Sequence, residues 1–356
     1  MSARLARLDV RRLDVPMKEP FGIAGGAQTR AANVLVRAVL SDGTVGWGEG
    51  SPMPAFNGET QAGTLAAARR AAALLRGAEA GSWESWGPRL RKLLPRRACA
   101  RAAVETAVFD AWSRRLGLPL RVLFGGAETR LATDITIPIV PPEKAAAAAR
   151  DIRAFGVRTL KIKVGRRVED DAARVLAAMG AAPRSRLMLD ANAGYSATDA
   201  LRLLRLLRAE GIAPELFEQP TVAADLAGMR RVRRTGKVRV AADESADSSP
   251  AVLRLAAAGA CDVVNVKVMK LGLLGAWEAA RVARASGFSL MIGGLVETRL
   301  GMTAAAHLAC GLGGFEFADL DTPLFLASDP MRGVPIARGG VYDLAPVKAG
   351  IGVSPK

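Results

Sequence analysis

Five residues with chemically useful side chains occur at nearly even intervals in the second half of the chain. They are Lys163, Asp190, Glu218, Asp243 and Lys267, about 25 residues apart, each at or near the end of an apolar run. This interval is the length of one strand-plus-helix unit. If the runs are successive strands of a barrel, three carboxylates and two lysines converge at one mouth. Carboxylate oxygens are the ligands of a hard divalent cation such as Mg²⁺.

Lysine is rare in this chain, so its positions are informative. The 356 residues include 40 arginines and 10 lysines. Arginine keeps its proton in a protein, whereas a desolvated lysine can lose it. Lys161 and Lys163 lie two residues apart in an expected strand and therefore point to the same side, into the barrel. We expect burial, like charge and the metal to hold the pKa values of Lys163 and Lys267 well below about 10.4.

These residues together define a reaction. A substrate carboxylate held on the metal would have its α-carbon between Lys163 and Lys267, on opposite sides of the mouth. One lysine would remove the α-proton, and the other would return a proton to the opposite face. The metal and Lys161 would stabilise the enediolate formed between the two steps.

Composition bounds the protein class. A length of 356 residues accommodates one barrel and a smaller domain, and half of the residues are hydrophobic. No apolar stretch reaches membrane-spanning length and the N-terminal residues do not resemble a signal peptide, so we expect a cytoplasmic protein with no membrane partner. Three scattered cysteines predict no disulfide framework.

The net charge of +16 invites a nucleic-acid interpretation, which we do not favour. The excess is nearly all arginine, spread along helical segments without interleaved aromatic residues. The only histidine, His307, lies in an apolar helical stretch, where a buried, hydrogen-bonded histidine is expected. One histidine excludes a multi-histidine zinc site, and a Ser-His-Asp triad would depend on this residue alone.

The elements needed to position these residues can be read from the apolar pattern. We expect residues 1–125 to form an α+β capping domain with strands at 5–15 and 33–40 and helices at 60–77 and 96–116, leaving Lys18–Arg30 as a mobile loop. Residues 126–325 are predicted to form a (β/α)₇β barrel, a modified TIM barrel, and residues 326–356 to return to the capping domain. The eight expected barrel strands are 132–137, 159–164, 186–190, 215–218, 238–243, 262–268, 288–292 and 315–319.

The motifs resemble those of a known family. Lys-x-Lys, Asp-Ala-Asn, Glu-Gln-Pro, Asp-Glu-Ser and Asn-Val-Lys, in this order, are similar to the muconate lactonizing enzyme subgroup of the enolase superfamily. The resemblance implies metal ligands at Asp190, Glu218 and Asp243. It also implies that Lys163 and Lys267 are the acid/base pair and that Lys161 polarises the substrate carboxylate.

Within this subgroup, Asp319-Leu-Asp321 after the last strand resembles the motif with which dipeptide epimerases bind the α-ammonium group of the substrate. An alternative is that Asp321 only shapes the following turn. The resemblance therefore implies a Mg²⁺-dependent dipeptide epimerase that inverts the α-carbon of the C-terminal residue by 1,1-proton transfer. We also expect Thr136 and Glu297 to contact the substrate.

Other functions remain open. An N-acylamino acid racemase, an o-succinylbenzoate synthase-type lyase or a cycloisomerase of the same subgroup would keep the site but not need Asp319 and Asp321. A Schiff-base aldolase or a nucleic-acid-binding barrel would leave the three carboxylates without a role. Relatives that act on Ala-Glu dipeptides offer an arginine from the capping loop, which here has only Lys18 and Arg30 at its edges. An acidic substrate side chain is therefore not expected, and a homo-oligomer is possible.

Overall fold

The computed structural model describes residues 3–23 and 26–356. Its main element is an eight-stranded parallel sheet in the order β12-β11-β10-β9-β8-β7-β6-β5. The predicted fold class, a (β/α)₇β barrel with an α+β capping domain, is confirmed. The strands are β5 (Ile135–Ile137), β6 (Thr159–Lys163), β7 (Arg186–Asp190), β8 (Leu216–Glu218), β9 (Arg239–Ala242), β10 (Val263–Lys267), β11 (Ser289–Gly293) and β12 (Phe315–Asp319).

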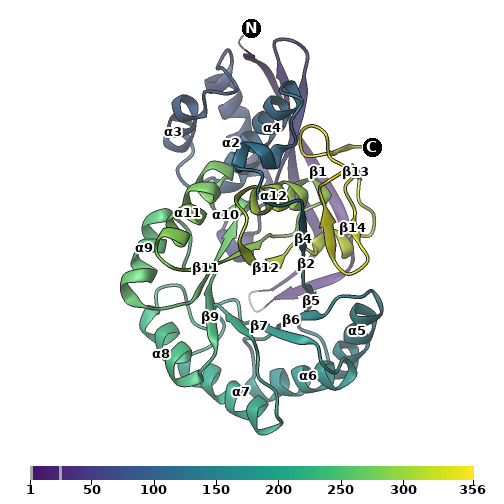
Figure 1. Cartoon of the computed structure of the whole chain (residues 1–356), viewed down its shortest axis with the longest axis vertical. Coiled ribbons are helices and arrows are strands. Elements are labelled where there is room, and N and C mark those ends of the chain that lie inside the picture. Colours follow the sequence, from purple (N-terminus) through teal and green to yellow (C-terminus); the bar gives the residue numbers. More distant parts are fainter. Residues whose placement is uncertain (1–2, 24–25) are drawn as a thin grey trace.

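Helices connect successive strands and wrap round the outside of the sheet (Figure 1). Their apolar faces point to the strands; in α7, for example, Leu203, Leu204 and Leu207 are buried while Arg205 and Arg208 are exposed. None of the described helices is long and apolar enough to cross a membrane. The helices are α5 (Pro142–Ala154), α6 (Val168–Ala181), α7 (Ala197–Ala209), α8 (Leu226–Gly236), α9 (Ser249–Ala258), α10 (Val268–Leu271), α11 (Leu273–Ala285) and α12 (Arg299–Leu312).

The barrel interior is a packed core below its polar mouth. A separate buried cluster, contributed by six strands, fills the inside of the sheet, and this is how side chains occupy small barrels. Polar side chains face inward only nearer the carboxyl ends. The cluster comprises Met188, Leu216, Ala241, Val263, Met291 and Phe317.

The first and last barrel strands meet through hydrogen bonds outside the ladder. The amide of Asp134 donates to the Ala318 carbonyl at 2.9 Å, and the amide of Leu320 donates to Thr133 Oγ1 at 2.8 Å. The strand predicted over 132–137 is interrupted here, giving β4 (Arg130–Ala132) and then β5. We call this junction the seam.

The capping domain begins with an antiparallel sheet, β1 (Leu5–Ile23), β2 (Gly26–Leu40) and β3 (Val45–Gly50). Alternate glycines let α4 pack directly on β3: a Cβ at Gly48 would lie 2.1 Å from the Ala103 carbonyl oxygen. The remaining elements are α1 (Pro54–Asn57), α2 (Gln61–Leu75), α3 (Trp83–Leu93), α4 (Ala98–Arg115) and η1 (Leu120–Phe124).

The prediction of an irregular loop over Lys18–Arg30 was wrong. β1 and β2 extend through this stretch as a long hairpin, with Phe21 paired to Gln28 and Gly22 to Ala27. Each strand satisfies the backbone of the other, which compensates for the weak apolar pattern. Residues 24 and 25 at its tip lie outside the described residues.

The C-terminal segment contacts both the barrel and the hairpin. β15 pairs with β4, whereas the amide of Ala327 donates to the Pro16 carbonyl of β1 at 2.9 Å. Figure 1 shows this yellow segment beside the purple β1. The domain boundaries at residues 125 and 325 stay predictions. The segment contains η2 (Thr322–Leu324), β13 (Met331–Gly333), β14 (Ile336–Ala337), β15 (Val341–Asp343) and β16 (Val353–Pro355).

Candidate active site

The carboxyl ends of the barrel strands carry the five evenly spaced residues. Lys163, Asp190, Glu218 and Lys267 end β6, β7, β8 and β10, and Asp243 directly follows β9. In the parallel register Lys163 lies beside Asp190, and Asp190 beside Glu218. All five side chains are buried. The structure therefore brings these residues together at one end of the barrel.

Lys161 lies at the centre of the acidic side chains. Its Nζ is 3.0 Å from Asp190 Oδ2, 2.7 Å from Glu218 Oε2 and 2.5 Å from Asp319 Oδ2. Burial alone would lower the pKa of Lys161, but the surrounding carboxylates raise it well above its usual value. Lys161 is thus a fixed positive charge that joins three strands.

Lys163 points into the barrel as the two-residue period predicted. Its Nζ lies 2.6 Å from Asp190 Oδ2 and 2.9 Å from Asn192 Oδ1. Asp190 is shared with Lys161, so a carboxylate lies between the two ammonium groups. Burial opposes ionisation of Asp190, but the lysines lower the pKa of this carboxyl group below its usual range.

On the other side of the mouth, two lysines bind one carboxylate. Lys267 Nζ lies 2.6 Å from Asp243 Oδ2, and Lys270 Nζ lies 2.6 Å from Asp243 Oδ1. Lys270 also donates to the Asn265 carbonyl at 3.0 Å. The ring of Phe56, from the capping domain, covers Lys267 with its centroid 4.9 Å from Nζ, an arrangement typical of cation–π contacts.

The carboxylates beside Lys267 act against the expected lowering of its pKa. Burial lowers the pKa of Lys267, but the charges of Asp243 and Glu218 outweigh this effect and raise it above the usual value. The expected lowering relied on burial, like charge and the metal together, and it stays a prediction. The protein groups by themselves favour the ammonium form of Lys267.

The three predicted metal ligands form an oxygen-rich set that fits Mg²⁺. Asp190, Glu218 and Asp243 are all buried, and burial raises the pKa of Glu218, with the charge of Asp190 adding to this effect. The pKa of Asp243 falls to about 2 because Lys267 and Lys270 outweigh its burial. Glu244 Oε2, beside Asp243, accepts no hydrogen bond, and Glu218 Oε2 has only its ion pair with Lys161. Carboxylate oxygens with spare acceptor capacity are what this cation requires.

A second acidic group lies at the seam. Among the described residues, the acids whose oxygens come within 4.8 Å of one another are Asp134, Asp319 and Asp321. The amide of Thr136 donates to Asp321 Oδ2 at 2.6 Å, and its hydroxyl donates to Asp319 Oδ1 at 3.4 Å. Asp319 is also the partner of Lys161. Asp321 therefore has a side-chain role at the site in addition to preceding the turn.

Glu297 does not line the cavity described below. Its side chain is buried and Oε1 accepts the amide of Leu295 at 2.8 Å. Its backbone exchanges hydrogen bonds with the Thr322 hydroxyl. Burial, reinforced by the charge of Glu49, raises the pKa of Glu297 to about 8. These contacts support the loop after β11, and the expected contact of Glu297 with the substrate stays a prediction.

A cavity of about 40 Å³ lies over the mouth. Two catalytic candidates, both acids of the Asp-x-Asp motif and four large apolar side chains line it. Phe56, one of the apolar side chains, comes from α1 of the capping domain. The lining residues are Met53, Phe56, Thr136, Lys163, Asn192, Lys267, Gly294, Leu295, Val296, Asp319, Asp321 and Thr322.

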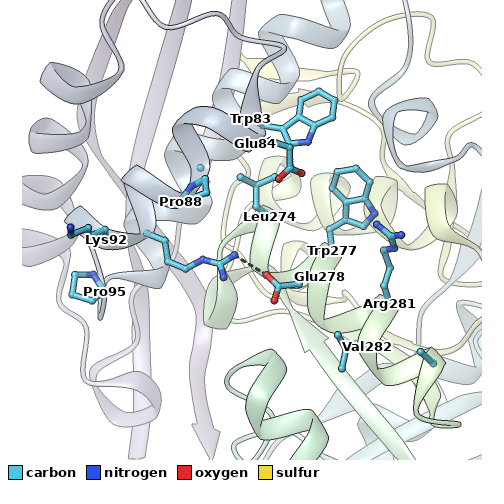
Figure 2. A pocket seen from close by; sticks show the side chains of 13 residues that line it. Trp83, Glu84, Pro88, Lys92, Pro95, Leu274, Trp277, Glu278, Arg281 and Val282 are labelled. Atoms are coloured by element: carbon cyan, nitrogen blue, oxygen red, sulfur yellow. Dashed lines mark hydrogen bonds and ion pairs between the residues drawn. The ribbon is translucent and has the colours of Figure 1, made fainter.

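A larger hollow of about 950 Å³ lies elsewhere, between α3 and α11. Figure 2 shows Trp83 and Trp277 along it, and Arg91 Nη2 pairs with Glu278 Oε2 across it at 2.9 Å. It contains none of the lysine–carboxylate pairs of the mouth. Its size therefore does not make it the reactive site.

The only histidine has a structural position, as expected. His307 in α12 is buried; Nδ1 accepts the amide of Arg121 at 3.0 Å and Nε2 lies 3.0 Å from the Ile351 carbonyl. Burial lowers the pKa of His307 to about 4. The neutral ring joins η1 to the C-terminal segment.

Sequence reasoning missed four polar neighbours of the site. Asn192 and Asn265 stand inside quoted motifs without an assigned role; Asn265 Nδ2 donates to Glu218 Oε1 at 2.7 Å. Lys270 has the same signal as the other lysines, a lysine in an arginine-rich chain. Asp134 carries no such signal.

Two family profiles match the sequence. The profile described as mandelate racemase / muconate lactonizing enzyme, N-terminal domain, matches residues 7–125. The profile described as enolase C-terminal domain-like matches residues 144–356. The two matches together span most of the chain.

Individual relatives agree with these profiles. An aromatic dipeptide epimerase of Herpetosiphon aurantiacus is 44% identical, over 99% of both chains. A crystal structure of a mandelate racemase/muconate lactonizing enzyme from Sorangium cellulosum is 49% identical, with complete coverage of both chains and a TM-score of 0.95. The dipeptide epimerase of Enterococcus faecalis V583, solved with Mg and L-Leu-L-Tyr, is 34% identical, with 99% and 100% coverage and a TM-score of 0.94.

Proposed function

This chain belongs to the mandelate racemase/muconate lactonizing enzyme family of the enolase superfamily, and on that premise we propose that it is a Mg²⁺-dependent dipeptide epimerase. The reaction inverts the α-carbon of the C-terminal residue of a dipeptide. One observation carries the proposal: Lys163, Lys267, Asp319 and Asp321 all line one cavity. Two proton-transfer groups and a receptor for a free amino terminus are thus available to one molecule.

The two lysines have complementary positions for proton transfer. Lys163 ends β6 and Lys267 ends β10, four strands further round an eight-stranded sheet. An α-carbon between them can lose its proton to the neutral Nζ of one lysine and so become planar. It can then receive a proton on the opposite face from the ammonium group of the other lysine. This transfer reverses the configuration of the carbon and leaves the substrate otherwise unchanged.

The remaining charges bind the substrate carboxylate. A Mg²⁺ ion held by Asp190, Glu218 and Asp243 would supply positive charge that stabilises the substrate carboxylate as negative charge develops on it. Lys161 adds a second, permanent positive charge at the same place. Because Lys161 is held by three carboxylates, it needs no rearrangement during the reaction.

The cavity lining favours an apolar or aromatic side chain on the substrate. Met53, Phe56, Leu295 and Val296 supply large apolar surfaces, and the described lining residues include no arginine. The cations beside the hairpin tip bind elsewhere; Lys18 Nζ, for example, donates to the Leu324 carbonyl at 2.8 Å. The aromatic dipeptide epimerase to which this chain is 44% identical supports the same preference.

Deuterium exchange tests this function directly. The purified protein with Mg²⁺ is incubated in D₂O with a dipeptide library, including L-Ala-L-Phe, L-Leu-L-Tyr and L-Ala-L-Glu, and ¹H NMR follows the α-proton of the C-terminal residue. We expect exchange and formation of the epimer, faster for the apolar dipeptides than for L-Ala-L-Glu. Absence of exchange throughout the library contradicts the proposal. Equal exchange of N-acyl amino acids favours the racemase alternative.

A further inference from the structure

The seam contains an acidic residue whose burial is not explained by a contribution to the stability of the fold. Asp134 precedes β5, and its backbone joins this strand to β12. Its side chain is only 3% exposed, and neither carboxylate oxygen has a hydrogen-bond partner. A buried carboxyl group without partners is costly to fold.

The nearby cation compensates for this group only in part. The Nζ of Lys161 lies within 3.0 Å of Asp190, Glu218 and Asp319. Its charge opposes the rise in the pKa of Asp134, but the described hydrogen bonds include none from Lys161 to Asp134. Asp319 accepts from Lys161 and from the Thr136 hydroxyl, and Asp321 accepts from the Thr136 amide. Burial, followed by the charge of Asp319, raises the pKa of Asp134 well above its usual value. The acids of the seam are therefore short of positive charge.

The arrangement of the three acids fits a small cationic group. The oxygens of Asp134, Asp319 and Asp321 lie within 4.8 Å of one another, so one point is at most about 2.8 Å from all three, the length of a charge-assisted N–H···O bond. A primary ammonium group has three protons, one for each carboxylate. Asp319 and Asp321 open onto the cavity, whereas Asp134 does not line it.

We propose that Asp134 is the third carboxylate of the subsite for the substrate's free amino terminus, and that its buried charge makes the site selective for primary ammonium groups over acylated ones. The inference rests on the proposed function and adds a residue to it. Because a buried carboxyl group without hydrogen-bond partners costs stability in the protein alone, its presence is consistent with a role in binding.

The test compares Asp134→Asn with the wild-type protein. Asparagine keeps the shape and removes the charge, so KM for exchange of L-Ala-L-Phe is expected to rise about tenfold, the usual effect of losing one charge-assisted contact, with kcat nearly unchanged. The inhibition constant of N-acetyl-L-Ala-L-Phe should stay unchanged. The melting temperature should stay the same or rise, because the buried carboxyl group has no hydrogen bond to lose.

Asp262→Asn is the matched control. It makes the same chemical change next to β10 at the opposite end of the barrel, where Arg233 is the partner, and KM should not change. Equal KM values for Asp134→Asn and the wild type overturn the inference. So does a parallel loss of melting temperature and of affinity for both the free and the acetylated dipeptide, which indicates a structural role.

Two further measurements separate the possible failures. Mg²⁺ alone is titrated calorimetrically into the wild type and Asp134→Asn; weaker Mg²⁺ binding with unchanged KM assigns the trio to a metal and overturns the inference. If the wild type exchanges no dipeptide, the proposed function fails. Calorimetric binding of L-Ala-L-Phe and of its N-acetyl derivative then tests Asp134 by itself: an equal effect of Asp134→Asn on both contradicts the inference.

Discussion

The two ends of the barrel place positive and negative charges in opposite ways. At the amino end of the strands, Arg186 binds Glu215 and Arg239 binds Glu316, each with both guanidinium branches. These side chains are between one-third and one-half exposed. At the carboxyl end, the lysines are fully buried against carboxylates. Carboxylates are thus paired with arginine at the surface of the amino end and with lysine in the interior of the carboxyl end.

The difference separates architecture from chemistry. A planar guanidinium group binds a carboxylate with two parallel hydrogen bonds and does not release its proton, which suits a link between strand ends. An ammonium group is compact and can exchange its proton when its surroundings change. In a chain with four arginines for each lysine, Lys161, Lys163 and Lys267 lie at the end where the proposed reaction moves protons.

Replacing a lysine by arginine at the carboxyl end should have the largest effect on activity. Lys163→Arg and Lys267→Arg keep the positive charge but provide no group that can release a proton. We expect each variant to lose about 10²- to 10⁴-fold in kcat for epimerisation of an apolar dipeptide, measured by α-proton exchange in D₂O.

The control is the same exchange at the amino end. Arg186→Lys and Arg239→Lys should retain kcat within about twofold, since these pairs are far from the reacting atoms and contribute little. Full activity of Lys267→Arg, or inactivity of Arg239→Lys in a folded protein, would break the contrast between the ends.

Removal of the metal should have the next largest effect on activity, through the carboxylates at the carboxyl end. Chelation with EDTA is expected to abolish exchange, and added Mg²⁺ should restore it, because the three carboxylates at the mouth then regain their cation. Mg²⁺ should also raise the melting temperature of the wild type but not of Glu218→Gln. A Mg²⁺-dependent shift of the same size in both proteins would contradict the assigned ligand.

Acids at the two ends should differ in their contribution to stability. Glu244 at the mouth is mostly buried, and its Oε2 has no partner; burial raises the pKa of Glu244 to about 8. Glu244→Gln is expected to raise the free energy of unfolding by about 1 kcal/mol. Asp262→Asn, which removes the partner of Arg233, should lower it by about 1 kcal/mol. Urea unfolding without Mg²⁺ measures both.

Breaking a surface pair should have the smallest effect, and this effect should disappear at acidic pH. The hydrogen bonds from Arg239 lower the pKa of Glu316 below the usual 4.5. The unfolded chain therefore binds the proton first as pH falls, so the pair stabilises the protein above pH 4.5 and this contribution is lost below it. An Arg239→Ala/Glu316→Ala double-mutant cycle should give about 0–1 kcal/mol at pH 7 and no coupling near pH 2.

The barrel and most of its mouth could be predicted from the sequence because one pattern, an apolar run followed by a charged residue, repeats along the chain. The predicted strands 186–190 and 315–319 match β7 and β12 to the residue, and the acidic or basic residue that ends each apolar run marks the mouth. The hairpin over Lys18–Arg30 was missed because its stability comes from pairing between strands and not from its own apolar pattern.

Properties that depend on contacts across the barrel could not be predicted. Nothing local to Lys267 shows that Asp243 approaches within 2.6 Å, so the charge that opposes a lowered pKa of Lys267 could not be predicted. Asp134 lies 185 residues before Asp319, and only closure of the barrel brings them together. Lys270, in contrast, could have been found by applying the lysine-for-arginine signal to every lysine.

The carboxylate of Asp321 helps to close the ring of strands, and it also belongs to the proposed binding site for the ligand's amine. Asp321 accepts the Thr136 amide of β5, so any molecule that engages this carboxylate also acts on the join between the first and last strands. Occupancy should therefore slow hydrogen–deuterium exchange at the amide of Thr136, far more than at amides of β8 on the opposite wall. The junction between the first and last strands should therefore be most stable when a ligand is bound.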